Sequence, residues 1–443
     1  MYPRCLSVFC LILLFLTACR DTQQEPLDLQ TLFRQYAEGV ETLNIPPLRL
    51  SYKENLDSIS TTVHLMRQLD FFTHYSSQLK AFRLKDLEGE ERYDFQLLKF
   101  EIDLHLERLD LEEHFKSVQE DQPISQKGLF RVKMRDVWYR HFLKRWLNAD
   151  VSPEELYKLG KEEVSRAQTE IRRIQQELGY ADDSTGFYQF LNADTFFLND
   201  EQLLREAFEL RKATVQQNLE RLFPITSFAN VNIARGEDQS LARVPGYYRA
   251  ADSTFYYNIF DSPYNRRNVD WLYLHEAVPG HHYQLSIAEQ FRDSIAPFRE
   301  GRMYMSYIEG WAGYVEGLGK ELGLYASPTA ELGSWEWDLV RSVRVVLDIG
   351  LNYLGWSDRD ALRYWRLHIV NQDDIARREI KRMRDWPAQV HTYKYGAAQL
   401  RRLIAEERER QGESFSLKVF HGRLLEYGAL PLWLLEQRLR EEE

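Results

Sequence analysis

Apolar residues recur at helical spacing along most of this chain, and that pattern limits the possible folds more than any other feature. The segment 152–155 (Ser-Pro-Glu-Glu) is a capping box with proline at the first helical position, and it opens a helix predicted to reach about Leu178. Helical periodicity also runs through 53–118 and from about Val269 to the end of the chain. We therefore predict a mainly α fold.

The helical pattern is interrupted between residues 225 and 260. Short runs of β-branched and aromatic residues occur at 228–233 and 247–259, and Gly236, Pro245 and Gly246 break them. This segment predicts a small hairpin or three-stranded sheet. On either side of it, no repeat or low-complexity linker divides the chain. We expect an N-terminal helical lobe over 31–150 that continues into a large helical region over 151–443.

All three cysteines lie at the N-terminus, at positions 5, 10 and 19. Residues 1–18 have the basic start, apolar run and small closing residues of a secretory signal peptide. The tetrad 16–19 (Leu-Thr-Ala-Cys) resembles a bacterial lipobox, which implies cleavage before Cys19 and acylation of that residue. The alternative is a plain signal peptide that is cut near Ala18. The lipobox predicts a polar tether over 19–30 and a lipid anchor in the bacterial cell envelope, in the periplasm or on the outer-membrane surface.

The charge balance and the missing thiols narrow the possible chemistry. The chain has 57 Lys and Arg against 68 Asp and Glu, a net charge of -11, so we expect no nucleic-acid partner. Beyond Cys19 there is no cysteine, which excludes disulfides and cysteine-bound metals from the folded body. Histidine, glutamate and aspartate remain as metal ligands.

Three of the eleven histidines fall within the eight residues 275–282 (His-Glu-Ala-Val-Pro-Gly-His-His). A histidine followed by glutamate on a helix, with a second histidine nearby, is the zincin arrangement, in which histidines bind Zn²⁺ and the glutamate activates water. We therefore predict His275 as a zinc ligand and Glu276 as the general base. The usual position of the second histidine is occupied by Pro279, which cannot bind a metal.

The second zinc ligand is either His281 or His282. On an unbroken helix, a residue seven positions beyond His275 lies about 10 Å along the axis, too far for shared ligation. Pro279 cannot donate to the carbonyl oxygen of His275, so the helix must widen or kink there, and Gly280 permits the turn. A widened turn that absorbs two extra residues favours His281, with His282 in reserve.

A third protein ligand is expected from the segment 307–317 (Tyr-Ile-Glu-Gly-Trp-Ala-Gly-Tyr-Val-Glu-Gly). Glu309 lies 28 residues beyond His281, which leaves room for a connection and a returning helix. The small residues Gly310, Ala312 and Gly313 would let that helix approach the first one closely. We predict Glu309 as the third ligand and keep Glu316, two turns further on, in reserve.

Five separated blocks of the chain resemble the bacterial family named domain of unknown function 885. They are HEAVPGHHYQ, YIEGWAGYVEGLGKELGLY, RSVRVVLDIGLNYLGWS at 341–357, PAQVHTYKYG at 387–396 and FHGRLLEYGALPLWLLE at 420–436. The resemblance covers most of the chain from about Tyr157. One position departs from the pattern, since Asn352 stands where we expect a histidine.

The resemblance implies a mainly helical, gluzincin-type metallopeptidase fold, akin to angiotensin-converting enzyme, the oligopeptidases and thermostable carboxypeptidases. In such a site the oxyanion needs a hydrogen-bond donor opposite the metal, and Tyr393 is the candidate, with His391 or His282 as alternates. Arg341 and Arg344 lie at helical spacing with Asp348. They either bind a substrate carboxylate or form a buried ion-pair network.

The expected function is zinc-dependent hydrolysis of peptide bonds, as a carboxypeptidase or oligopeptidase, by an enzyme that a lipid anchors to the membrane. One alternative keeps the zinc and changes the substrate, giving an amidase or esterase that acts on cell-wall or modified amino-acid compounds. The other is a non-catalytic surface lipoprotein that binds glycans or peptides. Such a protein has no need for a His-Glu pair beside two further histidines, so metal content separates the two classes.

Overall fold

A computed structural model describes residues 28–120, 122–260 and 262–441. The predicted signal peptide and Cys19 lie outside these residues. The predicted tether ends earlier than expected, because helix α1 (Leu29–Glu41) begins inside it. Asp28 caps this helix by accepting a hydrogen bond from the Thr31 backbone N–H at 2.9 Å.

The described chain is mainly α-helical, as predicted, with only small sheets. Helix α6 begins at the predicted capping box, where Ser152 and Glu155 bond to each other's backbone N–H groups. The remaining helices before the sheet are α2 (Tyr52–Asp57), α3 (Thr62–Leu79), α4 (Gly89–Gln119), α5 (Arg135–Leu147), α6 (Pro153–Glu177), α7 (Ser184–Leu191) and α8 (Glu201–Asn218). Those after it are α9 (Asn268–Glu276), α10 (His281–Gln290), α11 (Met305–Val315), α12 (Pro328–Asn352), α13 (Asp358–His368), α14 (Asp373–Asp385), α15 (His391–Gln411), α16 (Leu417–Leu425) and α17 (Leu432–Glu441).

The interruption in the helical pattern contains the predicted three-stranded sheet, in the order β2-β4-β3. Its strands are β2 (Asn232–Arg235), β3 (Gly246–Arg249) and β4 (Thr254–Tyr257). β2 pairs with β4 in parallel and β3 pairs with β4 antiparallel, so β3 is an edge strand. A second sheet escaped prediction, because its strands β1 (Phe197–Leu198) and β5 (Tyr264–Asn265) are only two residues long.

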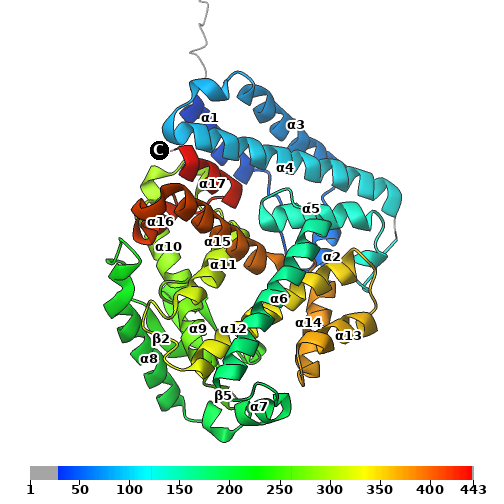
Figure 1. Ribbon diagram of the computed structural model, residues 1–443. Coiled ribbons are helices and arrows are strands. Elements are labelled where there is room, and N and C mark those ends of the chain that lie inside the picture. The colour runs from blue at the N-terminus through cyan, green and yellow to red at the C-terminus, as the bar shows by residue number, and fades with distance from the viewer. Residues whose placement is uncertain (1–27, 121, 261, 442–443) are drawn as a thin grey trace, which may run out of the picture.

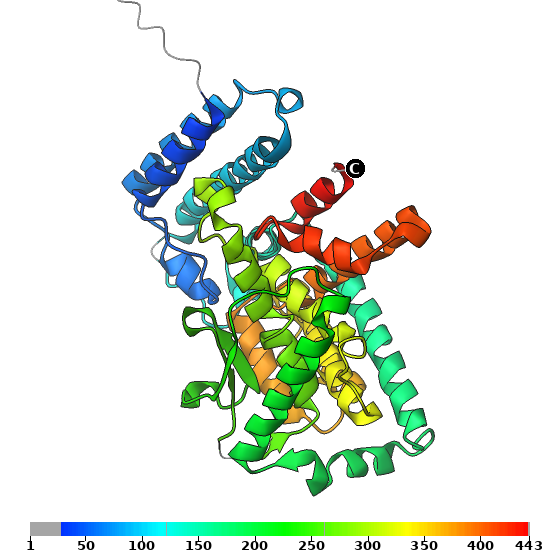
Figure 2. The same ribbon diagram turned by 90° about the vertical axis from the view of Figure 1, so that its left-hand side faces the viewer.

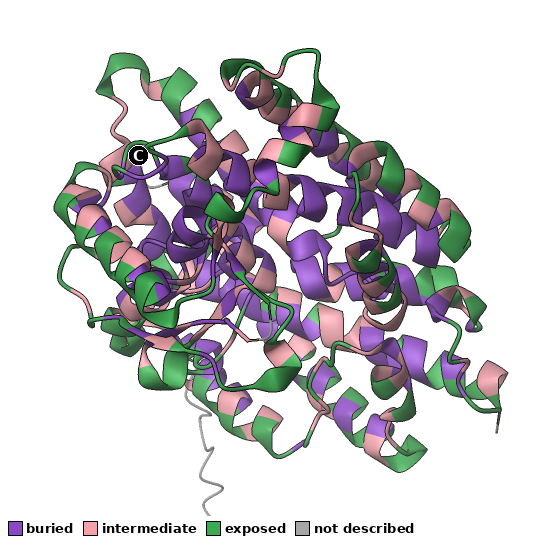
Figure 3. Cartoon of the chain, turned by 90° about the horizontal axis from the view of Figure 1, so that it is seen from below, coloured by how far each residue is buried: buried purple, intermediate pink, exposed green. Residues whose placement is uncertain are grey.

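Long helices surround the buried core. Helices α6 and α12 pack side by side through the middle of the molecule, and α11 packs against α15 (Figure 1). Helices α1, α3 and α4 lie together at one end, where the C-terminal α17 contacts α4 (Figures 1 and 2). The largest apolar cluster joins side chains of these N-terminal helices to others from α8–α11 and α15–α17. Seen from below, buried residues fill the interior, and exposed ones follow the outer helix faces (Figure 3).

No helix in the described part of the chain is both long and apolar enough to span a bilayer.

Candidate metal centre

The helix that carries His275 and Glu276 stops at Glu276, and a second helix begins at His281. The predicted widening or kink is a complete break: residues 277–280 form a non-helical connection with a cis Val278–Pro279 peptide bond, and no widened helical turn is present there. Gly280 is required in this connection, because a Cβ atom there would lie 1.9 Å from the carbonyl oxygen of His275. Trp311 on α11 donates from Nε1 to the carbonyl oxygen of Pro279 at 2.8 Å and holds the connection in place.

His275, His281 and Glu309 come together, although they belong to three different helices. One ligand atom from each lies within 4.8 Å of the other two. Glu309 Oε2 is 3.7 Å from Nε2 of His275 and 3.5 Å from Nε2 of His281. The side chains are only 5%, 13% and 13% exposed for His275, His281 and Glu309. This arrangement could hold a divalent metal ion.

Burial and ion pairing act in opposite directions on the pKa values of this group. Burial alone lowers the pKa of His275, but its contacts with Glu309 and Glu316 outweigh that effect and raise it to about 9. Burial alone raises the pKa of Glu309, but the neighbouring His275 and His281 hold it well below its ordinary value. The carboxylate is thus the stable form of Glu309, as a metal ligand requires.

Glu316, the reserve ligand, lies on the other side of the His275 ring. Its Oε1 accepts from Nδ1 of His275 at 2.7 Å, which leaves Nε2 directed at Glu309. Arg341 donates to both Glu316 oxygens, at 2.7 and 2.9 Å. Glu316 therefore orients a candidate ligand and does not belong to the ligand group itself. Arg341 takes the second of its two predicted roles, in a buried ion pair.

Glu276 lies beside the group, and the sheet contacts it directly. The backbone N–H of Tyr248, in edge strand β3, donates to Glu276 Oε2 at 2.9 Å. Burial raises the pKa of the Glu276 carboxyl above its ordinary value. The contact of Tyr248 with Glu276 could not be predicted, since nothing in the pattern of a short strand indicates which residue will face a helix 28 positions away.

His282 points away from the candidate ligands. Its Nδ1 is 3.0 Å from the Tyr248 hydroxyl and its Nε2 is 2.7 Å from the carbonyl oxygen of Ala229. Both ring nitrogens are thus engaged with other partners. The structure places His281, and not His282, next to Glu309.

Tyr393 on α15 is close to the group. After burial, the charge of Glu309 is the largest influence that raises the pKa of its hydroxyl. The guanidinium carbons of Arg341 and Arg344 lie 5.8 and 5.4 Å from the centre of its ring. Tyr393 therefore lies close enough to Glu309 to feel its charge, and its role as the hydroxyl donor stays a prediction.

His391 does not reach this place, although it lies only two residues from Tyr393. It is fully buried, and its Nε2 is 3.2 Å from Asp348 Oδ1 and 3.1 Å from the Tyr139 hydroxyl. Helical geometry explains the separation, because residues two apart point to different faces. The expectation that His391 could serve as the oxyanion donor is therefore corrected.

Asn352, which stands where the resemblance leads us to expect a histidine, belongs to the same buried group as His391. Its Nδ2 lies 3.3 Å from Asp348 Oδ2 and donates to the carbonyl oxygen of Met383 at 2.9 Å. Its side chain has no hydrogen bond to His275, His281 or Glu309 in the described structure. The substitution therefore leaves the candidate metal ligands in place.

Arg344 differs from its neighbour Arg341. Its Nε is 3.5 Å from Glu379 Oε2, and neither Nε nor one terminal nitrogen has a hydrogen-bond partner among the described residues. The side chain is nevertheless 6% exposed. Arg344 thus pairs with Glu379 and lies beside the Tyr393 ring, with buried donors that no described hydrogen bond satisfies.

The small residues of α11 allow a close approach, but to a different helix from the one predicted. A Cβ atom at Gly310 would lie 2.5 Å from Cα of Gly396 on α15, and one at Gly396 would lie 1.9 Å from the carbonyl oxygen of Ser306. The close contact is therefore between α11 and α15. It brings Tyr393 and Glu309 to the same place.

Two solved structures share this architecture. One is the putative lipoprotein from Colwellia psychrerythraea, with 22% identity, a TM-score of 0.66, and coverage of 94% of this chain and 74% of that one. The other is a putative lipoprotein of unknown function from Shewanella oneidensis, with 16% identity, a TM-score of 0.73, and coverage of 94% and 100%. At these identities the likeness shows the fold alone. No match is found among curated proteins.

The sequence blocks that surround the candidate ligands all fall within one family region. Residues 133–439, which are more than half of the chain, match the model of that family. The region spans helices α5 to α16, and with them all the residues of the candidate metal centre. The chain therefore belongs to the family of bacterial proteins of unknown function designated DUF885.

Proposed function

We propose that this protein is a zinc-dependent hydrolase of peptide bonds with a gluzincin-type site. One observation carries the proposal: three ligand atoms, from His275, His281 and Glu309, lie within 4.8 Å of one another beside the buried carboxylate of Glu276. Two histidines and one glutamate are a common ligand set of catalytic zinc sites. The carboxylate of Glu276 lies beside them as a candidate base.

The residues fit Zn²⁺ in both their chemistry and their hydrogen bonding. Zinc accepts imidazole nitrogen and carboxylate oxygen, and three protein ligands leave one position open. Glu309 Oε2 is buried and has no hydrogen bond within the described structure, so a ligand bond would satisfy it. The Glu316 carboxylate fixes the His275 ring through Nδ1, which is the usual outer partner of a metal-bound histidine.

Zn²⁺, when bound, polarises a carbonyl group and lowers the pKa of a water molecule to about 7. Glu276 accepts the proton of the attacking water and passes it to the leaving amine. Its orientation is set by the Tyr248 backbone N–H. The Tyr393 hydroxyl donates to the oxygen on which negative charge develops in the transition state.

An extended peptide is the substrate class that the surroundings favour. Strand β3 is an edge strand, and the N–H of its residue Tyr248 points at Glu276 and not at β4. A peptide can therefore add to this edge through backbone hydrogen bonds and bring a carbonyl to Glu276. The unpartnered donors of Arg344, beside Tyr393, would bind a carboxylate of that peptide.

The proposed location is the bacterial cell envelope. The lipobox resemblance at 16–19 predicts that cleavage leaves Cys19 as the acylated first residue. In the described structure, α1 begins ten residues beyond it, at Leu29. A short segment would then join the lipid to the folded body.

Metal analysis and one substitution test the proposal. The purified protein should contain about one equivalent of zinc, and Glu276→Gln should retain it while lowering peptide cleavage by about 10²–10⁴-fold. The matched control is Glu289→Gln, because Glu289 lies exposed on α10 and forms only a surface pair with Arg292. Zinc-free protein, or full activity in Glu276→Gln, would refute the mechanism.

Substrates blocked at either terminus separate the possible activities. Loss of cleavage on blocking the C-terminal carboxylate supports a carboxypeptidase in which Arg344 holds that group. Cleavage of peptides blocked at both ends supports an oligopeptidase. Hydrolysis of simple amides or esters in place of peptides would favour the amidase or esterase alternative.

A further inference from the structure

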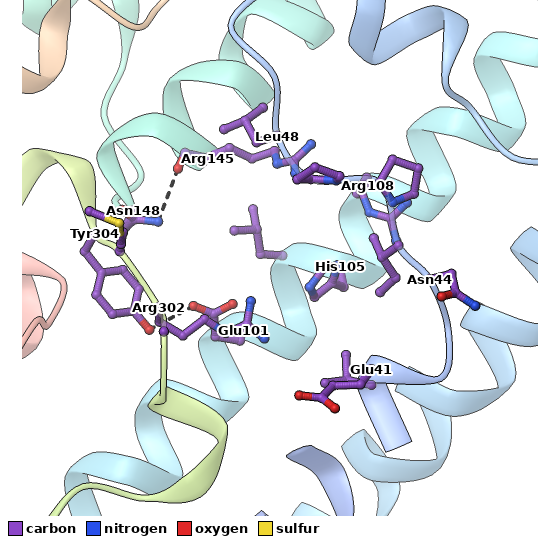
Figure 4. A pocket seen from close by; sticks show the side chains of 17 residues that line it. Glu41, Asn44, Leu48, Glu101, His105, Arg108, Arg145, Asn148, Arg302 and Tyr304 are labelled. Carbon is purple, nitrogen blue, oxygen red and sulfur yellow. Dashed lines mark hydrogen bonds between the residues drawn. The ribbon is translucent and has the colours of Figure 1, made fainter. Parts of the chain in front are cut away.

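A cavity of about 480 Å³, with both apolar and charged side chains in its wall, lies where the N-terminal helices meet the segment before α11. Its walls come from the end of α1, the segment 44–48, α4, α5 and residues 301–304 (Figure 4). None of these residues belongs to the candidate metal centre. The volume is in the range of small-molecule sites in proteins.

Three arginines face this cavity, from three different parts of the chain. Arg108 belongs to α4, Arg145 to α5, and Arg302 to the segment before α11. In Figure 4, Arg108 and Arg145 lie on one side of the cavity, and Arg302 lies with Glu101 on the other. The whole protein has a net charge of -11, so a cavity lined by three arginine side chains differs in charge from the rest of the molecule.

Arg108 is the arginine whose charge is balanced. It donates to both Glu112 oxygens at 2.9 Å and to Gln68 Oε1 at 2.5 Å. Only its Nε is left buried without a partner among the described residues. Arg108 therefore forms part of the wall and supplies at most one donor.

Neither Arg145 nor Arg302 has a salt-bridge partner among the described residues. Burial lowers the pKa of Arg302, but the charge of nearby Glu101 outweighs that effect and raises it, so Arg302 is partly balanced. Within the described residues, the Arg145 guanidinium has neither an ion pair nor a hydrogen bond, although it lines the cavity. Burial, and then the charge of Arg108, lower the pKa of Arg145 to about 10. Arg302 donates from Nε to the carbonyl oxygen of Phe298 at 3.3 Å, and its terminal nitrogens have no partner in the described structure.

The two glutamates that line the cavity, Glu101 and Glu41, form no salt bridge with Arg145 or Arg302 among the described residues. Glu101 accepts from the Tyr304 hydroxyl at 3.0 Å. Glu41 is exposed, at the end of α1. With Glu112 set against Arg108, and Glu101 against Arg302, the guanidinium of Arg145 keeps a positive charge with no acidic partner in the wall apart from the exposed Glu41. Partly buried charges gain from an opposite charge, so the cavity favours an anionic group.

We propose that this cavity is a binding site for a small anion, whose carboxylate or phosphate oxygens bind the guanidinium groups of Arg145 and Arg302. Guanidinium groups bind both kinds of oxyanion through paired, charge-assisted hydrogen bonds. The pocket has room for a metabolite-sized ligand, and Tyr304 and Asn148 supply further polar contacts at its edge. The site does not depend on the proposed hydrolase activity.

Calorimetric titration of the whole protein with inorganic phosphate, and separately with succinate, tests the site. We expect binding of at least one of them, and a loss of at least tenfold in affinity in both Arg145→Gln and Arg302→Gln. Phosphate that binds more tightly than succinate indicates a phosphorylated ligand, and the reverse order indicates a carboxylic acid. The exposed Arg363, which pairs only with Asp360 on the surface, supplies the control variant Arg363→Gln.

Both anions can also bind to zinc, so each titration is repeated in His281→Ala. Binding that persists in that variant and is lost on substituting the arginines supports the cavity. Binding that disappears with His281 but not with the arginines assigns the anion to the metal centre and overturns the proposal. Absence of binding at millimolar anion also overturns it. Arg302 lies only partly buried, so its variant remains informative if Arg145→Gln fails to fold.

Discussion

Two buried groups in this protein combine histidine with acidic side chains, and only one of them has the features of a metal site. In the first, His275, His281 and Glu309 direct atoms toward a common point, and Glu309 Oε2 has no other partner in the described structure. In the second, around Asp348 and His391, every acidic oxygen is already satisfied.

In the second group, which we call the closed group, the hydrogen-bond acceptors of Asp348 are all occupied. Its oxygens accept from the Tyr139 hydroxyl at 2.6 Å and from the Ala388 backbone N–H at 3.1 and 3.3 Å. His391 and Asn352 complete the shell. Residue type and burial are therefore similar in the two groups. What differs is the acidic oxygen: Glu309 Oε2 has no hydrogen-bond partner among the described residues, whereas both Asp348 oxygens accept hydrogen bonds. A free carboxylate oxygen suits a metal ligand, and a satisfied one suits a structural link.

The largest expected effect separates adjacent histidines. His281→Ala should weaken zinc binding by more than the roughly 10–100-fold that loss of an outer partner costs, because it removes a ligand. His282→Ala is the matched control and should keep one equivalent of zinc, since His282 bonds to Tyr248 and Ala229. The zinc affinity of each variant is measured from its zinc content and from competition with a chelator. Equal losses in the two variants would contradict the assignment.

A substitution in the closed group should affect stability and not metal binding. Asp348→Ala leaves the Ala388 N–H buried without an acceptor and removes the carboxylate partner of Tyr139, His391 and Asn352, so we expect the free energy of unfolding to fall by about 3–5 kcal/mol. Denaturant unfolding measures this change. Zinc content of the folded fraction should stay at that of the unmodified protein, and a specific loss of zinc would show that the two groups are coupled.

Tyr393→Phe tests the catalytic part of the first group. Removing an oxyanion donor should lower kcat by about 10²–10³-fold while zinc content and unfolding remain unchanged. Tyr395→Phe, two residues along the same helix, is the control. If kcat is the same for Tyr393→Phe as for the unmodified protein, Tyr393 only packs against the site.

The smallest effect is expected from the outer partner of His275. Glu316→Gln keeps an acceptor for Nδ1 but removes the charge that Arg341 balances, so zinc affinity should fall about 10–100-fold. Asp94→Asn is the control, because it disturbs the buried Arg299–Asp94 pair away from the metal centre. Both variants should be less stable, but only Glu316→Gln should bind zinc more weakly.

Much of this structure could be predicted from local patterns. The mainly α fold, the capping box at Ser152 and the three-stranded sheet follow from short-range spacing and backbone preferences, which act within a few residues. Pro279 and Gly280 likewise showed that the helix of His275 could not continue unchanged. Strands β1 and β5 escaped prediction because two residues carry no periodicity.

The sequence by itself determined that the chain is mainly helical, that metal ligands beyond Cys19 must be histidine or acidic residues, and that 275–282 and 309 are the places to look. Tertiary structure decided the roles within them. His281 and His282 are neighbours of identical chemistry, and Tyr393 and His391, both able to donate a hydrogen bond, lie within one helical turn. Only the packing of α9, α10, α11 and α15 determines which of them meet. The physical reason is that side-chain direction and remaining hydrogen-bond capacity depend on partners far away in the chain.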